Sequence, residues 1–228
     1  MNRTTTSFLV AVLTLIYFDG VAQAQDNKQG TSVQSSTVAN PAQQLTLKER
    51  EFADKLLKDT ETGVFASVKD LSPAQLSFKA APEKWSVEEC VKHIAAAEAS
   101  LWAMVDASLQ QAPNPESRKD IKFTDQDLIN AVEDRSHKSK TFEALEPANS
   151  PYKTTAEALA AFKANREKLI DFVKHTKSDL RNHVSVLPIG TYDAYQFIML
   201  IAAHSNRHTQ QIDEVKKSVN FPAKPRFL

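Results

Sequence analysis

Apolar residues recur every three to four positions along most of the chain, which is the spacing of amphipathic α-helices. Four long segments show this spacing, at residues 45–71, 86–111, 154–176 and 191–218. A shorter segment, residues 125–145, shows it with a heavily charged middle. After residue 24, no segment alternates apolar and polar residues and no Asn-Gly or Asp-Gly pair marks a hairpin. Four long helices with a minor fifth predict an all-α fold, a four-helix bundle.

Capping signals support these helix starts. Three predicted helices begin with a Ser or Thr followed three residues later by Glu, which is the capping-box pattern: Thr46 with Glu49, Ser86 with Glu89, and Thr154 with Glu157. Thr124 is expected to cap the short segment, and Thr191 the last helix. Prolines separate the helices, because proline lacks the N–H that a helix interior needs.

The first 24 residues have the pattern of a cleavable secretory signal. A short, weakly positive start precedes an apolar run, and Ala22-Gln23-Ala24 is a small-x-small cleavage site. The alternative, a transmembrane anchor, needs an apolar stretch of about 20 residues, and this run is shorter. We therefore expect residues 1–24 to be removed and the protein to be exported, periplasmic or secreted, with no stable membrane span after cleavage.

The mature chain is expected to form one domain. Residues 25–44 are rich in Gln, Ser, Thr and Asn, and are predicted to be a flexible linker because they can bury little apolar surface. Residues 45–220 form the predicted bundle, and residues 221–228 a tail that two prolines keep from continuing the last helix. A homodimer is left open.

Composition excludes several classes of function. The formal net charge is zero and no basic stripe is visible, so we expect no nucleic-acid partner. The chain has only four glycines, at positions that match neither a GxGxxG nor a Walker A loop. A GxSxG nucleophile elbow is absent as well. With a single cysteine, no intramolecular disulfide can form.

Histidines supply the candidate chemistry. His204 and His208 are four residues apart, so on a helix they project from one face and can share a divalent metal. Such a site needs a further ligand from another segment. The remaining histidines are expected to lie outside the site, in solvent or in loops: His137, His175 and His183.

Four residues near the histidines have alternative roles. Cys90 could be a thiolate ligand, but an inert buried cysteine is expected. Glu89 could be a second-sphere acceptor or a general base, but its place in the capping box is the simpler role. Glu98 is about 140° around the helix from His93, so it is expected to contact a neighbouring helix. Arg207 could bind an anionic substrate group or form a surface ion pair.

In combination, these motifs resemble the DinB-like superfamily of metal-binding four-helix bundles. The resemblance spans roughly residues 45–217. It rests on Leu71-Ser72-Pro73-Ala74-Gln75-Leu76, on Lys84-Trp85-Ser86-Val87, on His93 with Glu98, and on His204-x-x-x-His208-x-x-Gln211-Ile212. The resemblance implies a long crossover between the second and third main helices, carrying the minor fifth helix. It also implies that His93, His204 and His208 are the metal ligands. Some members are thiol-dependent transferases or isomerases in the cytosol, whereas this chain has an export signal.

The resemblance and the histidine spacing together favour an enzyme. We expect a metal-dependent hydrolase or transferase that acts on a small molecule through a three-histidine site. The metal is divalent: zinc, nickel, iron or manganese. The alternatives are a non-catalytic metal- or ligand-binding bundle, and a bundle without metal. An open pocket at the histidines would favour the enzyme, and a closed site filled by apolar side chains would favour a structural role.

We predict that the protein isolated from its native host begins near Gln25 and is found outside the cytoplasm, because Ala22-Gln23-Ala24 is placed for signal-peptide cleavage. N-terminal sequencing of the fractionated protein measures this directly. An intact Met1 would show that cleavage does not occur.

Overall fold

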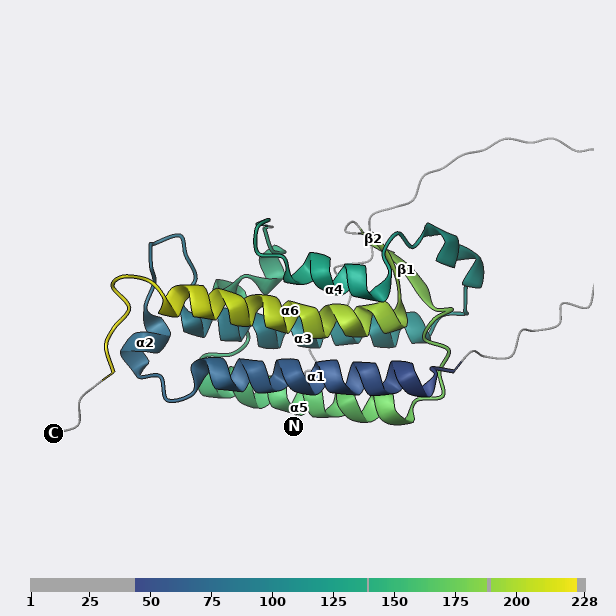
Figure 1. Ribbon diagram of the computed structural model, residues 1–228, viewed down its shortest axis with the longest axis horizontal. Coiled ribbons are helices and arrows are strands. Elements are labelled where there is room, and N and C mark those ends of the chain that lie inside the picture. Colours follow the sequence, from purple (N-terminus) through teal and green to yellow (C-terminus); the bar gives the residue numbers. More distant parts are fainter. Residues whose placement is uncertain (1–43, 139, 188–189, 225–228) are drawn as a thin grey trace, which may run out of the picture. The chain divides into compact units, whose positions relative to one another are not determined.

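Four long helices form the bundle. The computed structural model describes residues 44–138, 140–187 and 190–224. The long helices are α1 (Leu47–Val68), α3 (Val87–Leu109), α5 (Thr155–His175) and α6 (Ala194–Lys216). Helices α1 and α3 each pack against both α5 and α6 (Figure 1). The α1 and α6 helices run in one direction and α3 and α5 in the other, so the predicted all-α bundle is confirmed.

Local sequence fixes where these helices begin. The three predicted capping boxes form, with reciprocal bonds between the cap and the Glu at Thr46, Ser86 and Thr154. Each box satisfies backbone N–H groups that would otherwise lack partners at the helix start. A short helix, α2 (Pro73–Ser77), has its own capping box from Ser72. It follows α1, which ends at Val68, three residues before the predicted limit.

The crossover from α3 to α5 is long, as expected, and follows the side of α6. Its elements are η1 (Pro115–Asp120), α4 (Asp125–Glu133), η2 (Glu143–Leu145) and η3 (Pro147–Asn149). The predicted helix at residues 125–145 was too long, because α4 ends at Glu133. Beyond it, the Asp134 carboxylate accepts the Ser136 backbone N–H at 2.8 Å, a local bond that competes with helix continuation.

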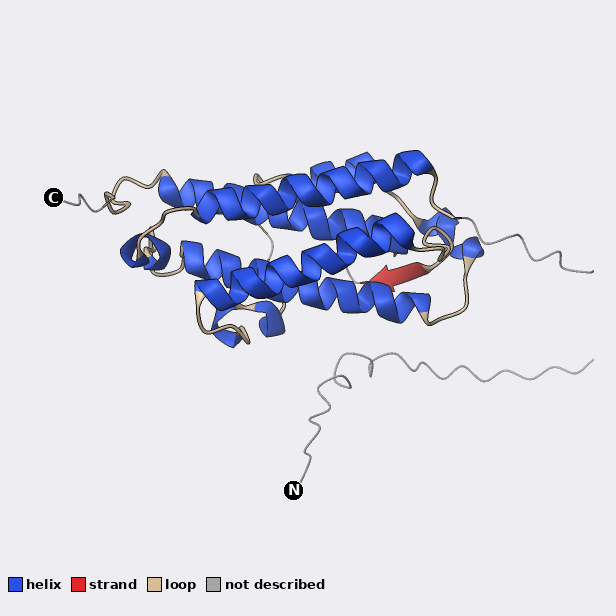
Figure 2. Ribbon diagram, turned by 90° about the horizontal axis from the view of Figure 1, so that it is seen from below, coloured by secondary structure: helices blue, strands red, loops and turns tan. Residues whose placement is uncertain are grey.

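A small hairpin precedes α6, and the expectation of a chain without strands was wrong here. Strands β1 (Val184–Leu187) and β2 (Gly190–Asp193) pair antiparallel at one end of the bundle (Figure 2). Four residues per strand are too few for alternation to stand out in the sequence. Thr191 pairs with Val186 in this hairpin, so it does not cap α6 as predicted. The cap is Asp193, which accepts the Gln196 N–H at 2.8 Å.

A buried arginine ties the four long helices together. Arg166, on α5, has no exposed surface and uses all five of its N–H groups. It donates to both carboxylate oxygens of Glu98 on α3, at 2.8 and 2.7 Å. It also donates to the Leu57 carbonyl and the Thr60 hydroxyl on α1, and to the Ser205 hydroxyl on α6. Glu98 therefore contacts a neighbouring helix, as expected.

This polar layer divides the core in two. One apolar cluster contains Leu57, Leu169 and Ile198, and the other contains Phe162 and Ile212. In the part of the chain that the structure describes, no helix is both long and apolar enough to span a bilayer. The predicted signal peptide and most of the linker, along with the end of the tail, lie outside the described residues.

We predict that Arg166→Met destabilises the protein by about 3–5 kcal/mol, because it leaves the buried Glu98 carboxylate without its partner. The Arg166→Met, Glu98→Leu double variant should lose much less stability than the sum of the single variants, since no buried charge remains. Urea unfolding measures all three free energies. Additive losses would mean that the pair is not coupled.

Candidate metal centre

The bundle brings three histidines from two helices together. His93 lies in the second turn of α3, and His204 and His208 lie near the middle of α6. Because α3 and α6 run in opposite directions side by side, these segments face each other. His93 and His208 are buried, whereas His204 is partly exposed. The last helix thus presents two imidazoles where its apolar face would otherwise continue.

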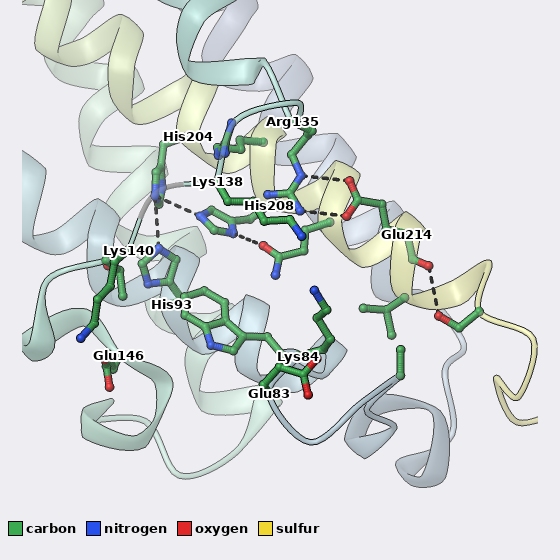
Figure 3. Close-up of a pocket in the computed structure, with 17 residues that line it drawn as sticks. Glu83, Lys84, His93, Arg135, Lys138, Lys140, Glu146, His204, His208 and Glu214 are labelled. Atoms are coloured by element: carbon green, nitrogen blue, oxygen red, sulfur yellow. Dashed lines mark hydrogen bonds and ion pairs between the residues drawn. The ribbon is translucent and has the colours of Figure 1, made fainter.

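The three imidazoles converge through their Nε2 atoms (Figure 3). The His204 Nε2 atom lies 3.2 Å from the His93 Nε2 atom and 3.2 Å from the His208 Nε2 atom. One ring nitrogen of each residue falls within 4.8 Å of those of the other two. Among the described residues, this is the group of His, Cys, Asp and Glu side chains arranged to hold a metal ion.

Hydrogen bonds at the far side of two rings set their tautomers. The His93 Nδ1 atom lies 2.8 Å from the Leu145 carbonyl oxygen, and the His208 Nδ1 atom lies 2.9 Å from the Gln211 side-chain oxygen. Both partners accept, so both Nδ1 atoms carry the proton and both Nε2 atoms keep a lone pair. His204 has at most one Nε2 proton to share between them. A cation at this point satisfies all three nitrogens, and the residues therefore fit a divalent metal.

The surroundings keep these imidazoles neutral, which is the form that binds metals. Burial lowers the pKa of His93, although its bond to Leu145 opposes this. Burial lowers the pKa of His204 to about 3, with a further contribution from His93. Burial and the two other imidazoles hold the pKa of His208 well below its usual range. Metal binding would not have to compete with protons at neutral pH.

Trp85 forms an aromatic wall beside the cluster. Its ring lies 4.8 Å from the His93 ring, centroid to centroid, and stacks on the His208 ring at 5.8 Å with an interplanar angle of 21°. Trp85 directly precedes the Ser86 cap of α3. The same local sequence that starts the helix therefore fixes the wall of the site.

The histidines form part of the lining of an open pocket of about 660 Å³. Most of its other lining residues are polar or charged, and they come from the loop before α3, from the crossover and from the end of α6 (Figure 3). The Nε2 cluster is therefore accessible from solvent, and the site is not closed by Phe or Leu side chains.

The structure distinguishes between the alternative roles of three residues near the histidines. Cys90 is buried, burial raises the pKa of its thiol, and it is neither in the histidine cluster nor in the pocket lining. Glu89 serves the capping box and pairs with Lys79. Arg207 forms no ion pair among the described residues. Its guanidinium instead donates to backbone carbonyls of the crossover, those of Val132, Asp134 and His137.

The remaining histidines lie outside the cluster. His137 and His175 are exposed and contact Asp134 and Asp171. His183 was expected to lie in solvent or in a loop with no site role; it is in a loop but buried, with its Nδ1 atom 2.6 Å from the Asp179 carbonyl oxygen. His183 directly precedes strand β1, and nothing in the helical periodicity indicated a hairpin here.

Two contributions to the site were not apparent from sequence. The Leu145 carbonyl that orients His93 is a backbone group, and no side-chain pattern marks it. Trp85 was recognised only as part of the Lys84-Trp85-Ser86-Val87 motif, and nothing in that motif showed that its ring lies against the histidines.

Comparison with known proteins agrees with the geometry. YuaE of Bacillus subtilis, described as an uncharacterized protein, is 25% identical over 155 residues, covering 67% of this chain and 90% of its own length. The structure of YfiT from Bacillus subtilis, described as a probable metal-dependent hydrolase with an unusual four-helix bundle topology, superposes with a TM-score of 0.53 at 13% identity. That match covers 80% of this chain and 94% of YfiT, and it shows a common fold.

The family comparison covers most of the bundle. Residues 56–212 match the model of the DinB superfamily, and this range contains all three clustered histidines. The chain therefore belongs to the DinB superfamily.

Proposed function

We propose that this protein is a metal-dependent hydrolase or transferase that acts on a small molecule, with His93, His204 and His208 as the metal ligands. The observation that carries the proposal is the convergence of three Nε2 atoms at the lining of an open pocket. YfiT, which shares the fold, is described as a probable metal-dependent hydrolase. At such a site a divalent cation supplies Lewis acidity toward a carbonyl or phosphoryl oxygen and activates water.

The protein's own residues prepare this site. The Leu145 carbonyl and the Gln211 side chain hold the Nδ1 protons of His93 and His208, which keeps their Nε2 atoms free of protons. Trp85 excludes water from one side of the cluster. Glu83 and Glu146 line the pocket without an ion pair among the described residues, so they are the candidate proton acceptors.

The pocket favours catalysis over a non-catalytic binding role. A structural metal site has all its coordination positions filled by protein, whereas three histidines leave at least one open. Here the open side faces a pocket large enough for a small molecule, lined with charged groups. We further propose that the protein acts outside the cytoplasm, on the basis of the signal pattern in residues 1–24.

We predict that protein purified without chelator carries about one divalent ion per chain, and that His204→Ala or His208→Ala removes it, because each variant leaves too few ligands. Elemental analysis measures the content, and His137→Ala and His175→Ala, which alter exposed histidines, are the controls. Circular dichroism establishes that each variant is folded. Full occupancy in the His93→Ala, His204→Ala, His208→Ala triple variant would disprove the ligand assignment.

We also predict a pH dependence in the chelated protein. Burial lowers the pKa of all three clustered histidines, so below about pH 6.5 the unfolded chain binds protons that the folded chain does not. The free energy of unfolding should therefore fall as the pH decreases from 7 to 5. Bound metal should add stability at pH 7, and this gain should change little down to pH 5, because the folded imidazoles stay neutral across this range and protons do not compete for their nitrogens.

Urea unfolding at several pH values measures this dependence. The control is the His93→Gln, His204→Gln, His208→Gln variant, in which the slope between pH 7 and 5 should be much smaller. Equal slopes in the chelated wild type and this variant would mean that the three imidazoles are not held neutral by the fold.

A further inference from the structure

The pocket beside the histidines has an excess of cationic side chains. Its lining contains five lysines and arginines, namely Lys84, Arg135, Lys138, Lys140 and Arg207. It contains three carboxylates, those of Glu83, Glu146 and Glu214. The excess is thus two positive charges in a chain whose formal net charge is zero. A concave surface of one sign concentrates ligands of the opposite sign, and a cation at the histidines would strengthen this effect.

Two of these cations are already engaged in holding the crossover. Arg135 forms a bidentate ion pair with Glu214 on α6, at 3.0 and 2.8 Å. Arg207 donates to three carbonyls, including the Val132 carbonyl at 3.1 Å. Both arginines therefore fasten the segment after α4 to α6, close to His204 and His208. The Glu214 carboxylate balances the charge of Arg135, and backbone carbonyls occupy the guanidinium of Arg207. Both arginines are therefore poorly placed to bind a ligand.

Three lysines, Lys84, Lys138 and Lys140, remain without a carboxylate partner among the described residues, and the first two come from different loops and lie near each other. Lys84 lies in the loop before α3, and Lys138 lies in the crossover after α4. Neither forms an ion pair with any residue that the structure describes, and both side chains are exposed to the pocket (Figure 3). The nearby Lys84 ammonium lowers the pKa of Lys138. Two ammonium groups so close repel each other unless an anion lies between them.

The backbone on both sides keeps these lysines in place. Lys84 donates its backbone N–H to the Ala81 carbonyl at 2.9 Å, and it directly precedes Trp85, which is stacked on the histidine rings. Lys138 directly follows His137, whose carbonyl accepts from Arg207. These contacts fix the backbone from which the two side chains reach the pocket, and they do not involve the charge of either lysine.

We propose that Lys84 and Lys138 form a binding subsite for an oxyanion, a carboxylate or a phosphate, of the substrate. The inference rests on the proposed function, because it makes the substrate a small anionic molecule whose reacting group lies at the histidines. Two ammonium groups from opposite loops match the two or more oxygens of such a group, and each contact would be a charge-assisted hydrogen bond. The subsite holds and orients the substrate, and its lysines are positioning residues.

The test compares anionic probes with a neutral isostere. The full chain, loaded with Zn²⁺ and separately chelated, is titrated with benzoate, phenyl phosphate and benzamide, and each Kd is measured by calorimetry or NMR. The wild type should bind one of the anions about tenfold more tightly than benzamide. Lys84→Gln, Lys138→Gln should abolish this preference, and Lys84→Arg, Lys138→Arg should retain it.

The matched control is Lys119→Gln, Lys153→Gln, which changes the net charge equally at two exposed lysines outside the pocket and should leave the preference unchanged. Retained preference in the Lys84→Gln, Lys138→Gln variant would overturn the subsite, since the anion would then bind elsewhere or only to the metal. A wild type with no preference for either anion would overturn it too. A lysine-dependent preference in a protein that binds no Zn²⁺ would support the subsite and refute the metal site.

Discussion

One buried arginine sets the relative positions of the helices on which the site depends. Arg166 reaches α1, α3 and α6 from α5 and satisfies every N–H group that it buries. Its partners lie close to the site in sequence, since Ser205 follows His204 and Glu98 is five residues beyond His93. A buried charge is costly unless it is fully paired, so few other alignments of these helices are acceptable. The alignment that satisfies Arg166 is also the one that brings the histidines together.

At the histidine site, by contrast, polar atoms are left without a full set of hydrogen-bond partners. Around Arg166 every hydrogen-bonding group has a partner, whereas at the cluster three Nε2 atoms meet with at most one proton among them. The Leu145 carbonyl and the Gln211 side chain enforce this arrangement from the far side of the rings. The complete network stabilises the fold, whereas the incomplete one leaves ring nitrogens available to a metal, and the two lie about one helical turn apart.

Sequence alone predicted the parts of this protein that depend on local chemistry. The three capping boxes, the four long helices and the role of Glu98 followed from spacing and residue type. The end of α4 and the hairpin before α6 could not be predicted in the same way. Asp134 interrupts α4 through a bond to Ser136, and Arg207 fixes the following loop through carbonyls. Arg166 was also missed, because a single arginine in an amphipathic helix resembles a surface residue until its partners from three other helices are known.

The central claim is that the fold presents three Nε2 atoms to one divalent metal. A crystal structure of the Zn²⁺-loaded protein, with anomalous scattering recorded at the zinc edge, tests it most directly. The account predicts one anomalous peak at about 2.0–2.1 Å from the Nε2 atoms of His93, His204 and His208, with the fourth position open to the pocket. A peak bound through Nδ1 atoms, a peak at Cys90, or no peak at the cluster in zinc-loaded crystals would contradict it.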